Sequence, residues 1–372
     1  MTVILIEFII VLIGFCGSAV LFHHFPLLPG AQRKAMSFPS VSIIIPARNE
    51  EKNLALLLKD LSTQILPAHE IICVDDASED ATARIALSFG VKLISLHDKP
   101  AGWTGKSWAC QNGADAAKGD LLLFLDADVR LGKDGIRRLV QACVESGCTI
   151  SVQPYHKTNK MYEQFSMMFN LVQIAANGTA LPKPHNLGLY GPVILISQSD
   201  YRKAGGHESA KGSVIEDMTL GLQLKKMSLP YRLFIGDADI SFRMYGDGFH
   251  SLLQGWVKNL ATGASKMPLP LFLMVFFWIT SLASVPLQLA KFAFSANTPW
   301  LIVYSLFYII WVLILVTLVK RVGHFRRWVL AFYPILVLFF LSVFVVSMIK
   351  KIFGLKVTWK GRSIRVGKKQ CE

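Results

Sequence analysis

The sequence predicts an α/β domain, built on a mostly parallel β-sheet flanked by helices, which lies between hydrophobic segments able to cross a membrane. Two observations predict the sheet: short apolar runs alternate with amphipathic runs, and acidic residues directly follow two of the short runs. A third predicts the membrane segments, because 52% of the 372 residues are hydrophobic and the mean hydropathy is +0.43. That hydrophobicity is concentrated at the two ends, whereas the middle has the composition of an ordinary globular domain.

The first hydrophobic segment runs from Val3 to Phe22. Its length suits a membrane span, for which about 20 residues suffice. It lacks the basic start and the small-residue cleavage site of a signal peptide, so we expect residues 1–24 to form an uncleaved anchor. The basic residues that follow it are His23, His24, Arg33 and Lys34. Because positive residues favour the cytoplasmic side, the N-terminus is predicted to face outwards, with a linker over 25–39 and a cytoplasmic domain over 40–246.

Further apolar segments lie near the C-terminus. They are Pro268 to Ala290, Trp300 to Val319 and Trp328 to Ile349. The basic loop 320–327 belongs on the cytoplasmic side, which agrees with two crossings after a cytoplasmic domain. A third crossing would place the basic tail, 350–372, outside, against the same rule. Because Pro334 interrupts the last segment, the sequence leaves open whether the membrane region 268–349 has two spans, three spans, or two spans and a re-entrant segment.

The net charge narrows the class of binding partner, and the cysteines indicate the cellular compartment. A net charge of +14 suits either nucleic acid or an anionic membrane surface. The basic residues crowd the tail directly after an apolar segment, and no nucleic-acid motif accompanies them, so we expect a membrane partner and no nucleic acid. The 6 cysteines show no CxxC or zinc-ligand spacing, which fits reduced thiols in a cytosolic domain.

The middle of the chain alternates predicted strands and helices. A β-branched strand at Val41 to Ile45 precedes a leucine-rich helix that Asn49 is expected to cap, and a strand at Glu70 to Val74 precedes a helix that Ser78 is expected to cap. The next strands are predicted at Val91–Ser95, Leu121–Leu125 and Thr149–Val152, and the next helices at Thr104–Ala117 and Lys133–Glu145. This alternation predicts right-handed crossovers and a mostly parallel sheet. No GxGxxG follows the first strand, so a dinucleotide site is unsupported.

Acidic residues follow two of these strands. Asp126 and Asp128 come directly after the run LLLFL, and side chains two apart in a strand point the same way, so both carboxylates could converge on one cation. Asp75 and Asp76 end the earlier strand. Open α/β sheets bind ligands at this edge, and a hard divalent ion that holds a diphosphate would offset the repulsion between the carboxylates. The alternative interpretation of both motifs is ordinary turn and helix-cap chemistry.

The order of the motifs resembles that of family 2 glycosyltransferases with the GT-A fold: PARNE after the first strand, VDDASED after the second, GWTGKSWAC before the fourth and DAD after it. In that family the first acidic motif contacts the uridine of a nucleotide sugar, and the DXD motif binds Mg²⁺ or Mn²⁺ on its diphosphate. The resemblance implies that Asp76 contacts the base and that Asp128 is the metal ligand. The donor-binding residues it implies are Pro46, Arg48, Glu50, Asp76, Lys106, Asp126 and Asp128.

Lys106 stands in a loop whose glycines allow close approach to phosphate, where its charge would stabilise the leaving group. The alternative for Lys106 is a solvated surface lysine.

Further on, GPVILISQSDYRKAGGHE resembles the acceptor side of the family, and the family carries its general base at the Asp of an ED pair, here Asp217. The alternative for Glu216 and Asp217 is that they are acids favoured by the helix dipole. The acceptor-side residues that the resemblance implies are Gly191, His207, Glu216, Trp256 and Lys258.

Two amphipathic stretches bear on the acceptor. One contains Met161, Phe165, Met168, Phe169 and Val172, a face that suits either a lipid substrate or a packed core. The other, residues 247–267, leads straight into the late hydrophobic segments and suits a lipid–water interface. Processive polysaccharide synthases carry QxxRW here, whereas this chain reads QGWVK and has few spans, so a single transfer is favoured.

Segments such as SVQPYH, FRMY and GWVKNL make the chain most similar to bacterial glycosyltransferases of C30 carotenoid acids. That resemblance implies UDP-glucose as donor, a carotenoid carboxylate as acceptor and a glucosyl ester as product, and makes other carotenoid-pathway enzymes candidate partners. Hydroxyl-bearing lipids such as a hopanoid, diacylglycerol or polyprenyl phosphate are the alternative acceptors. Asp217 favours these slightly, because an ionised carboxylate needs no base. A transporter is disfavoured, because the late segments contain almost no charged residues.

Overall fold

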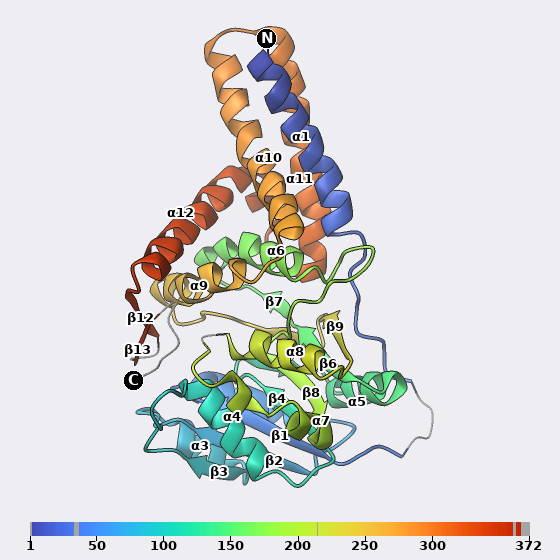
Figure 1. Cartoon of the computed structure of the whole chain (residues 1–372), viewed down its shortest axis with the longest axis vertical. Coiled ribbons are helices and arrows are strands. Elements are labelled where there is room, and N and C mark those ends of the chain that lie inside the picture. The colour runs from blue at the N-terminus through green and yellow to red at the C-terminus, as the bar shows by residue number, and fades with distance from the viewer. Residues whose placement is uncertain (1, 33–36, 214, 360–361, 366–372) are drawn as a thin grey trace. The chain divides into compact units, whose positions relative to one another are not determined.

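The computed structural model describes residues 2–32, 37–213, 215–359 and 362–365, which form two compact units (Figure 1). The α/β unit contains Pro26–His156, Asn186–Met244 and the described residues from Gly354 onwards. The helical unit contains the described residues up to Phe25, Lys157–His185 and Tyr245–Phe353. Residues 157–185, which the sequence analysis assigns to the catalytic domain, therefore group with the helices.

A seven-stranded sheet forms the centre of the α/β unit, in the order β3-β2-β1-β4-β8-β6-β9. Its strands are β1 (Val41–Ala47), β2 (Glu70–Asp75), β3 (Lys92–Ser95), β4 (Leu121–Leu125), β6 (Thr149–Gln153), β8 (Val193–Ser197) and β9 (Tyr231–Ile235). β8 is antiparallel to both of its neighbours, and the other pairs are parallel. The mostly parallel sheet predicted from the alternation of strands and helices is confirmed.

Helices cover both faces of this sheet. They are α2 (Glu51–Leu61), α3 (Thr82–Ser88), α4 (Gly105–Asp115), α5 (Gly135–Ser146), α7 (Gln198–Lys203), α8 (Glu216–Lys226) and the 3-10 turn η2 (His207–Ala210). Ile43 and Ile45 of β1 belong to a buried core with the leucines of α2 and the apolar side of α5. Ile44 points to the other face, where a Cβ at Gly113 of α4 would lie 2.4 Å from its Cγ2 atom. Glycine at this position lets α4 approach β1 closely.

Short strands extend the unit beyond the main sheet. β10 (Ile240–Phe242) pairs in antiparallel fashion with β5 (Val129–Leu131) and in parallel fashion with β7 (Tyr155–Lys157). Near the end of the chain, β12 (Lys356–Trp359) and β13 (Arg362–Arg365) form an antiparallel hairpin. The β5–β10 pairing matters for the site, because β5 follows Asp128 directly.

The predicted helix caps in this unit are wrong. α2 begins at Glu51 rather than at the residue after Asn49, and α3 begins at Thr82 rather than after Ser78. Asn49 has a positive φ of 50° and accepts the Glu79 N–H, while the Ser78 hydroxyl accepts the Asn49 N–H. Both side chains join the loops after β1 and β2, so a contact between distant segments overrides the local capping preference.

The predicted linker is partly an edge of the folded unit. The Ile235 N–H donates to the Pro26 carbonyl at 2.7 Å, and the Leu28 N–H donates to the Ile235 carbonyl at 3.4 Å. The guanidinium of Arg138, which is 5% exposed, donates to the carbonyls of Leu28 and Pro29 at 2.8 and 2.9 Å. Residues 26–29 therefore pack on β9 and α5.

The helical unit contains the apolar ends of the chain. Its elements are α1 (Thr2–Leu21), η1 (Met161–Phe165), α6 (Ser166–Asn177), α9 (Phe249–Ala264), α10 (Leu269–Phe294), α11 (Thr298–Val322), β11 (Gly323–His324), η3 (Arg327–Phe332) and α12 (Tyr333–Ile352). Four stretches of the described chain are long and apolar enough to cross a membrane: Ile4–Leu21, Leu269–Phe294, Thr298–Val322 and Arg327–Ile352. The last apolar segment changes from the 3-10 helix η3 to α12 next to Pro334, which lies in the first turn of α12, where a proline is tolerated.

Small side chains let α1 pack against α10. A Cβ on Gly14 would lie 2.2 Å from the Cβ of Ser281, so the glycine is required for this approach. The Ser18 hydroxyl donates to the Gly14 carbonyl and accepts the indole N–H of Trp278 at 2.8 Å. Elsewhere in the unit, Phe169 of α6 stacks on Trp256 of α9 with ring centroids 4.5 Å apart. The apolar face of α6 is therefore packed core within its unit.

Candidate active site

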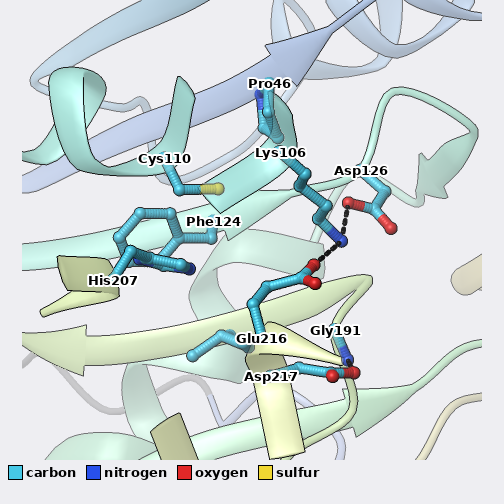
Figure 2. Close-up of a pocket in the computed structure, with 10 residues that line it drawn as sticks. Pro46, Lys106, Cys110, Phe124, Asp126, Gly191, His207, Glu216 and Asp217 are labelled. Carbon is cyan, nitrogen blue, oxygen red and sulfur yellow. Dashed lines mark hydrogen bonds and ion pairs between the residues drawn. The ribbon is translucent and has the colours of Figure 1, made fainter. Parts of the chain in front are cut away.

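A pocket opens at the carboxyl edge of the β1–β4 part of the sheet (Figure 2). Because β8 is antiparallel, the residues that precede it meet the end of β4: Leu125 pairs with Val193, and the Asp126 N–H donates to the Pro192 carbonyl at 2.9 Å. The residues that line the pocket are Pro46, Lys106, Cys110, Phe124, Asp126, Gly191, Ile194, His207, Glu216 and Asp217. The pocket thus unites segments that are far apart in the sequence.

Lys106 forms the central ion pairs of the pocket. It lies in the first turn of α4, whose start is capped by the Thr104 hydroxyl, which accepts the Ser107 N–H. Its Nζ lies 2.6 Å from Asp126 Oδ1 and 3.4 Å from Glu216 Oε1. Burial opposes the charge of Lys106, but the carboxylates of Asp126 and Glu216 outweigh it and raise the pKa well above its usual value. Lys106 is therefore a fixed positive charge, and the alternative of a solvated surface lysine is wrong.

Asp217 lies at the start of α8, beside these charges. Its Oδ2 accepts the Gly191 N–H at 2.9 Å and its Oδ1 accepts the Met218 N–H at 2.8 Å, so both oxygens are oriented. Burial and the neighbouring carboxylate of Glu216 raise the pKa of Asp217 to about 6, although the charge of Lys106 opposes the shift. A carboxylate with this pKa is mostly ionised at pH 7 and can still accept a proton, which suits a general base.

Gly191 makes this arrangement possible by having no side chain. A Cβ built on it would lie 2.7 Å from Asp217 Oδ2 and 3.3 Å from Lys106 Nζ. A larger residue would push the carboxylate away from the backbone N–H that orients it. Gly191 therefore positions Asp217.

His207 forms the apolar wall of the pocket. It is 2% exposed, and its ring packs on Phe124 with centroids 4.9 Å apart. Its Nδ1 lies 2.9 Å from the Tyr201 hydroxyl, which also accepts the His207 N–H and lies 3.2 Å from Gln111 Oε1. Burial lowers the pKa of His207 to about 4, so the imidazole is neutral at physiological pH.

The acidic loop after β2 is fixed by hydrogen bonds with backbone groups. Asp75 and Asp76 are 5% and 6% exposed and lie at the end of their strand. The guanidinium of Arg48 donates to the carbonyls of Asp76 and Ala77 at 2.6 and 2.9 Å, which fixes the loop. The carboxylate of Asp80 accepts N–H groups at the starts of both α2 and α3, from Glu51 and Thr82.

The structure brings some of the predicted residues together and separates others. Those that line the pocket are Pro46, Lys106, Asp126, Gly191, His207, Glu216 and Asp217. Arg48, Glu50 and Asp76 lie in the neighbouring loops, where the Glu50 N–H donates to the Thr82 hydroxyl. Trp256 and Lys258 belong to α9 of the helical unit, and Trp256 is 4% exposed in its packed core.

Several pocket residues were not predicted from the sequence. Cys110 follows Lys106 by one helical turn, so the spacing could have placed it on the same face of α4. Burial raises the pKa of the Cys110 thiol far above its usual range, and the thiol is therefore not a nucleophile. Phe124 and Ile194 are the inward-facing residues of β4 and β8, and Tyr201 lies behind His207, where no sequence motif marks it.

The residues that could hold a metal are the two aspartates after β4. Within the described residues, no group of three or more His, Cys, Asp or Glu side chains is arranged to hold an ion. Asp126 and Asp128 offer hard oxygen donors, and the Asp128 carbonyl accepts the N–H of Arg243, the residue directly after β10. Magnesium ions are commonly bound by one or two carboxylates plus phosphate oxygens and water. The donor set therefore fits a cation that arrives with a diphosphate rather than one held by protein alone.

Comparisons with known proteins agree with this site. The profile described as "Glycosyl transferase family 2" matches residues 42–204. A 4,4'-diaponeurosporenoate glycosyltransferase of Staphylococcus aureus strain USA300 is 35% identical over 369 residues, which cover 95% of this chain and 96% of the relative. The chain belongs to glycosyltransferase family 2. The enzyme of the same description from strain bovine RF122 is similar to the same extent, 35% over 369 residues with the same coverage.

A solved structure supports the fold of this family 2 glycosyltransferase. The mannosyltransferase PcManGT from Pyrobaculum calidifontis, in complex with GDP-Man and Mn²⁺, superposes with a TM-score of 0.54 at 15% identity. The match covers 91% of this chain and 99% of that one. The expectation of a GT-A fold with apolar helices at both ends is confirmed.

Proposed function

We propose that this glycosyltransferase transfers glucose from UDP-glucose to the carboxylate of a membrane-embedded C30 carotenoid acid, 4,4'-diaponeurosporenoate, with inversion at the anomeric carbon. The observation that carries the proposal is the similarity to the staphylococcal enzyme, which extends over 95% of the chain and so includes both apolar ends and the α/β unit. The product is a glucosyl ester. A single transfer is favoured over polymer synthesis, because the chain reads QGWVK where processive synthases carry QxxRW.

The donor is assigned to the edge of the sheet between the two acidic loops. Asp76, with Arg48 and Glu50 in the adjoining loops, would receive the uridine, and Pro46 lines the wall between them. Lys106 would stabilise the negative charge that develops on the diphosphate. A divalent cation, Mg²⁺ or Mn²⁺, would be held by Asp128, with Asp126 beside it, and would supply further neutralisation of the diphosphate.

Lys106 is paired with both Asp126 and Glu216. A diphosphate that binds beside Asp126 competes for the same ammonium group, so donor binding would loosen the ion pair to Glu216. Binding of the donor would in this way change the electrostatic surroundings of the neighbouring Asp217, whose pKa depends on the charges of Lys106 and Glu216. The acceptor side would then respond to the arrival of the donor.

The chemical step needs little from the protein when the acceptor is a carboxylate. One carboxylate oxygen attacks the anomeric carbon, the bond from that carbon to the diphosphate oxygen breaks, and UDP leaves with the electron pair. The neutral wall formed by His207 and Phe124 would exclude water from the attacking group, and Asp217 would not be needed as a base. No proton has to be removed, because a carboxylic acid is already ionised near pH 7.

A hydroxyl-bearing lipid is the second candidate acceptor, and one observation favours it. Asp217 has a pKa raised to about 6 and both of its oxygens are oriented, which is the arrangement expected of a base that takes a proton from an alcohol. Such an acceptor could be a hopanoid, a diacylglycerol or a polyprenyl phosphate. For this class Asp217 would be the catalytic base.

The proposed topology places the enzyme in the cell membrane with its α/β unit in the cytoplasm. Four apolar helices support membrane association, and the basic residues after α1 and between α11 and α12 favour the cytoplasmic side. Nucleotide sugars are cytoplasmic metabolites, which agrees with this orientation. Other enzymes of the carotenoid pathway are the proposed protein partners.

Mass spectrometry of lipid extracts tests the proposal directly, because it identifies sugar and acceptor together. The full chain is expressed in a host that makes the carotenoid acid, beside an empty-vector control and the Asp126→Asn variant. We expect a hexosyl ester of the acid in the first culture alone, and saponification should release the sugar. A hexosylated hydroxyl lipid would replace the proposed acceptor by the second candidate, whereas an extract identical to the control would reject both.

A further inference from the structure

Three polar side chains from three helices of the helical unit meet among apolar neighbours, away from any role in glycosyl transfer. They are Glu7 of α1, Gln288 of α10 and Tyr304 of α11. Gln288 is 8% exposed and Tyr304 is fully buried. Glu7 Oε2, Gln288 Oε1 and the Tyr304 hydroxyl are buried, and none of them has a hydrogen-bond partner among the described residues.

Ring packing and charge show that these groups share one place. Tyr304 packs on Phe292 of α10 with ring centroids 5.4 Å apart, and it lies close enough to Glu7 to feel its charge. Gln288 precedes Phe292 by one helical turn, which puts the two on the same face of α10. Lys291 Nζ lies 4.0 Å from Glu7 Oε2, an ion-pair distance that is too long for a hydrogen bond.

Leaving three buried oxygens without a donor is costly, at about 1–3 kcal/mol for each group. Polar groups inside apolar helices are usually kept for a functional reason. The carboxylate and the amide carbonyl can only accept, and the Tyr304 hydroxyl can donate to one acceptor at most, so the cluster lacks a hydrogen-bond donor. A primary ammonium group matches them best, because it offers three N–H donors and a positive charge to the carboxylate.

The position along the helices identifies where such a group would come from. Glu7 and Tyr304 lie near the beginnings of α1 and α11, and Gln288 lies near the end of α10. At 1.5 Å per residue, all three lie roughly 8–9 Å from the helix ends. α10 and α11, with 26 and 25 residues, are longer than the hydrocarbon core of about 30 Å, so positions this close to their ends lie near the boundary between the hydrocarbon core and the lipid headgroups.

Lys291 completes the match to a lipid headgroup. Its side chain is 51% exposed, so the ammonium can turn away from Glu7 towards the surface. There it would pair with a phosphate while the lipid ammonium takes its place beside Glu7. One zwitterionic headgroup with N–H donors would then satisfy every charged group of the cluster.

We propose that Glu7, Gln288 and Tyr304, with Lys291 at the rim, bind the headgroup of an aminophospholipid through its primary ammonium and its phosphate. This site is independent of the glycosyl-transfer proposal. It predicts a ranking among headgroups that differ only in the number of N–H donors. Phosphatidylethanolamine should bind best, its N,N-dimethyl derivative more weakly, and phosphatidylcholine, which has none, least.

The test uses the purified full chain in detergent micelles, with each of the three phospholipids added at equal mole fraction. Binding is measured as the upward shift of the thermal unfolding midpoint and as lipid retained in native mass spectrometry. We expect apparent affinity for phosphatidylethanolamine to exceed that for phosphatidylcholine by at least about tenfold, equivalent to about 1.4 kcal/mol. Equal retention of the three lipids would overturn the proposal.

Variants keep the test specific to these residues. Glu7→Gln and Tyr304→Phe should each remove most of the headgroup preference. Tyr308→Phe is the matched control on the same helix, because the Tyr308 hydroxyl already donates to the Ala331 carbonyl, and it should keep the preference. If Glu7→Gln fails to fold, Tyr304→Phe decides alone, and a full preference retained in that variant would count against the site.

Discussion

Two acidic loops lie at the same edge of the sheet and use their carboxylates differently. In the loop after β2, Asp80 accepts backbone N–H groups at the starts of α2 and α3 and thereby joins two helices. At the end of β4, Asp126 is paired with Lys106, and Asp217 of α8 lies beside them with a pKa raised to about 6. The residue type is the same, but the surroundings differ: Asp80 is held by hydrogen bonds at two helix starts, whereas Asp126 and Asp217 share a pocket with the charges of Lys106 and Glu216.

The largest effect is expected when the proposed metal ligand is removed. Asp128→Ala should lower transfer by about a thousandfold or more, because the diphosphate leaving group would lose its cation. Chelation of divalent ions should cause a loss of similar size in the unsubstituted enzyme. Release of UDP from UDP-glucose measures both.

Asp120→Ala is the matched control for this variant, because Asp120 lies at the other end of β4 and accepts hydrogen bonds from Ser40. It should retain near-normal activity. Full activity of Asp128→Ala would show that the acidic pair after β4 is only a turn.

Loss of the lysine should come next in size. Lys106→Met should reduce transfer by about 100- to 1000-fold, the range seen when one stabilising donor at a developing charge is removed. It should also raise the pKa of Asp217 above about 6, since the charge of Lys106 opposes that shift, and move the acid limb of the pH profile upwards.

Exposed Lys118 lies just beyond the end of α4, and Lys118→Met serves as the control for charge alone. It should alter neither rate nor profile. This test uses a hydroxyl acceptor, because Asp217 sets the acid limb only for that class. With such an acceptor, an unchanged limb in Lys106→Met would contradict the electrostatic link between Lys106 and Asp217.

The pH profile of the unsubstituted enzyme distinguishes the two acceptor classes. If Asp217 must accept a proton from a hydroxyl, activity should fall about tenfold for each pH unit below about 6. If the acceptor is a carboxylate, the limb should instead lie near the ordinary carboxyl range of about pH 4–5. Initial rates of transfer from pH 4.5 to 8, at saturating donor, report the position of the limb.

Asp217→Asn gives an independent check on this limb. The variant should cripple transfer to an alcohol and only weaken transfer to a carboxylate. Equal and total loss on the carotenoid acid would refute the view that the carboxylate acceptor needs no base.

Gly191→Ala should have a smaller effect. The added Cβ would lie 2.7 Å from Asp217 Oδ2, so the carboxylate must shift away from the N–H that holds it. We expect a fall in transfer of about tenfold with little change in the thermal midpoint, since a slight misplacement of a reacting group is costly. Gly30→Ala, where a Cβ would meet nothing within 4 Å, should leave both quantities unchanged.

The smallest effect on activity is expected from the structural loop. Burial alone would raise the pKa of Asp80, but hydrogen bonds from Thr82 and Glu51 outweigh it and lower the pKa. By linkage its stabilisation is present above the unfolded pKa and is lost as the pH falls through the folded one. Asp80→Asn should therefore destabilise the fold by about 1 kcal/mol at pH 7, with transfer within about twofold. A fall in transfer well beyond twofold, with a loss of stability no larger than expected, would instead place Asp80 in the donor site.

The sequence predicts the sheet well, because its strands are strongly apolar and short. It also predicts that Asp126 lies at the pocket, because a carboxylate directly after a parallel strand lies at the ligand-binding edge of the sheet. The helix caps at Asn49 and Ser78 were wrong because each side chain bonds to the other loop, a contact that spacing along the chain cannot reveal. Tyr201 was missed for the same reason: its role depends on His207 folding back over it.

The docking of residues 26–29 on β9 and α5 fixes where a soluble fragment of the enzyme can begin. A fragment that starts at Pro26 keeps the carbonyls that satisfy the buried guanidinium of Arg138. One that starts at Ser40, the boundary suggested by hydropathy alone, leaves two of its N–H groups without acceptors, at a cost of about 1–3 kcal/mol for each buried group. Removal of the anchor together with residues 26–29 would therefore destabilise the α/β unit through Arg138, whatever the membrane helix itself contributes.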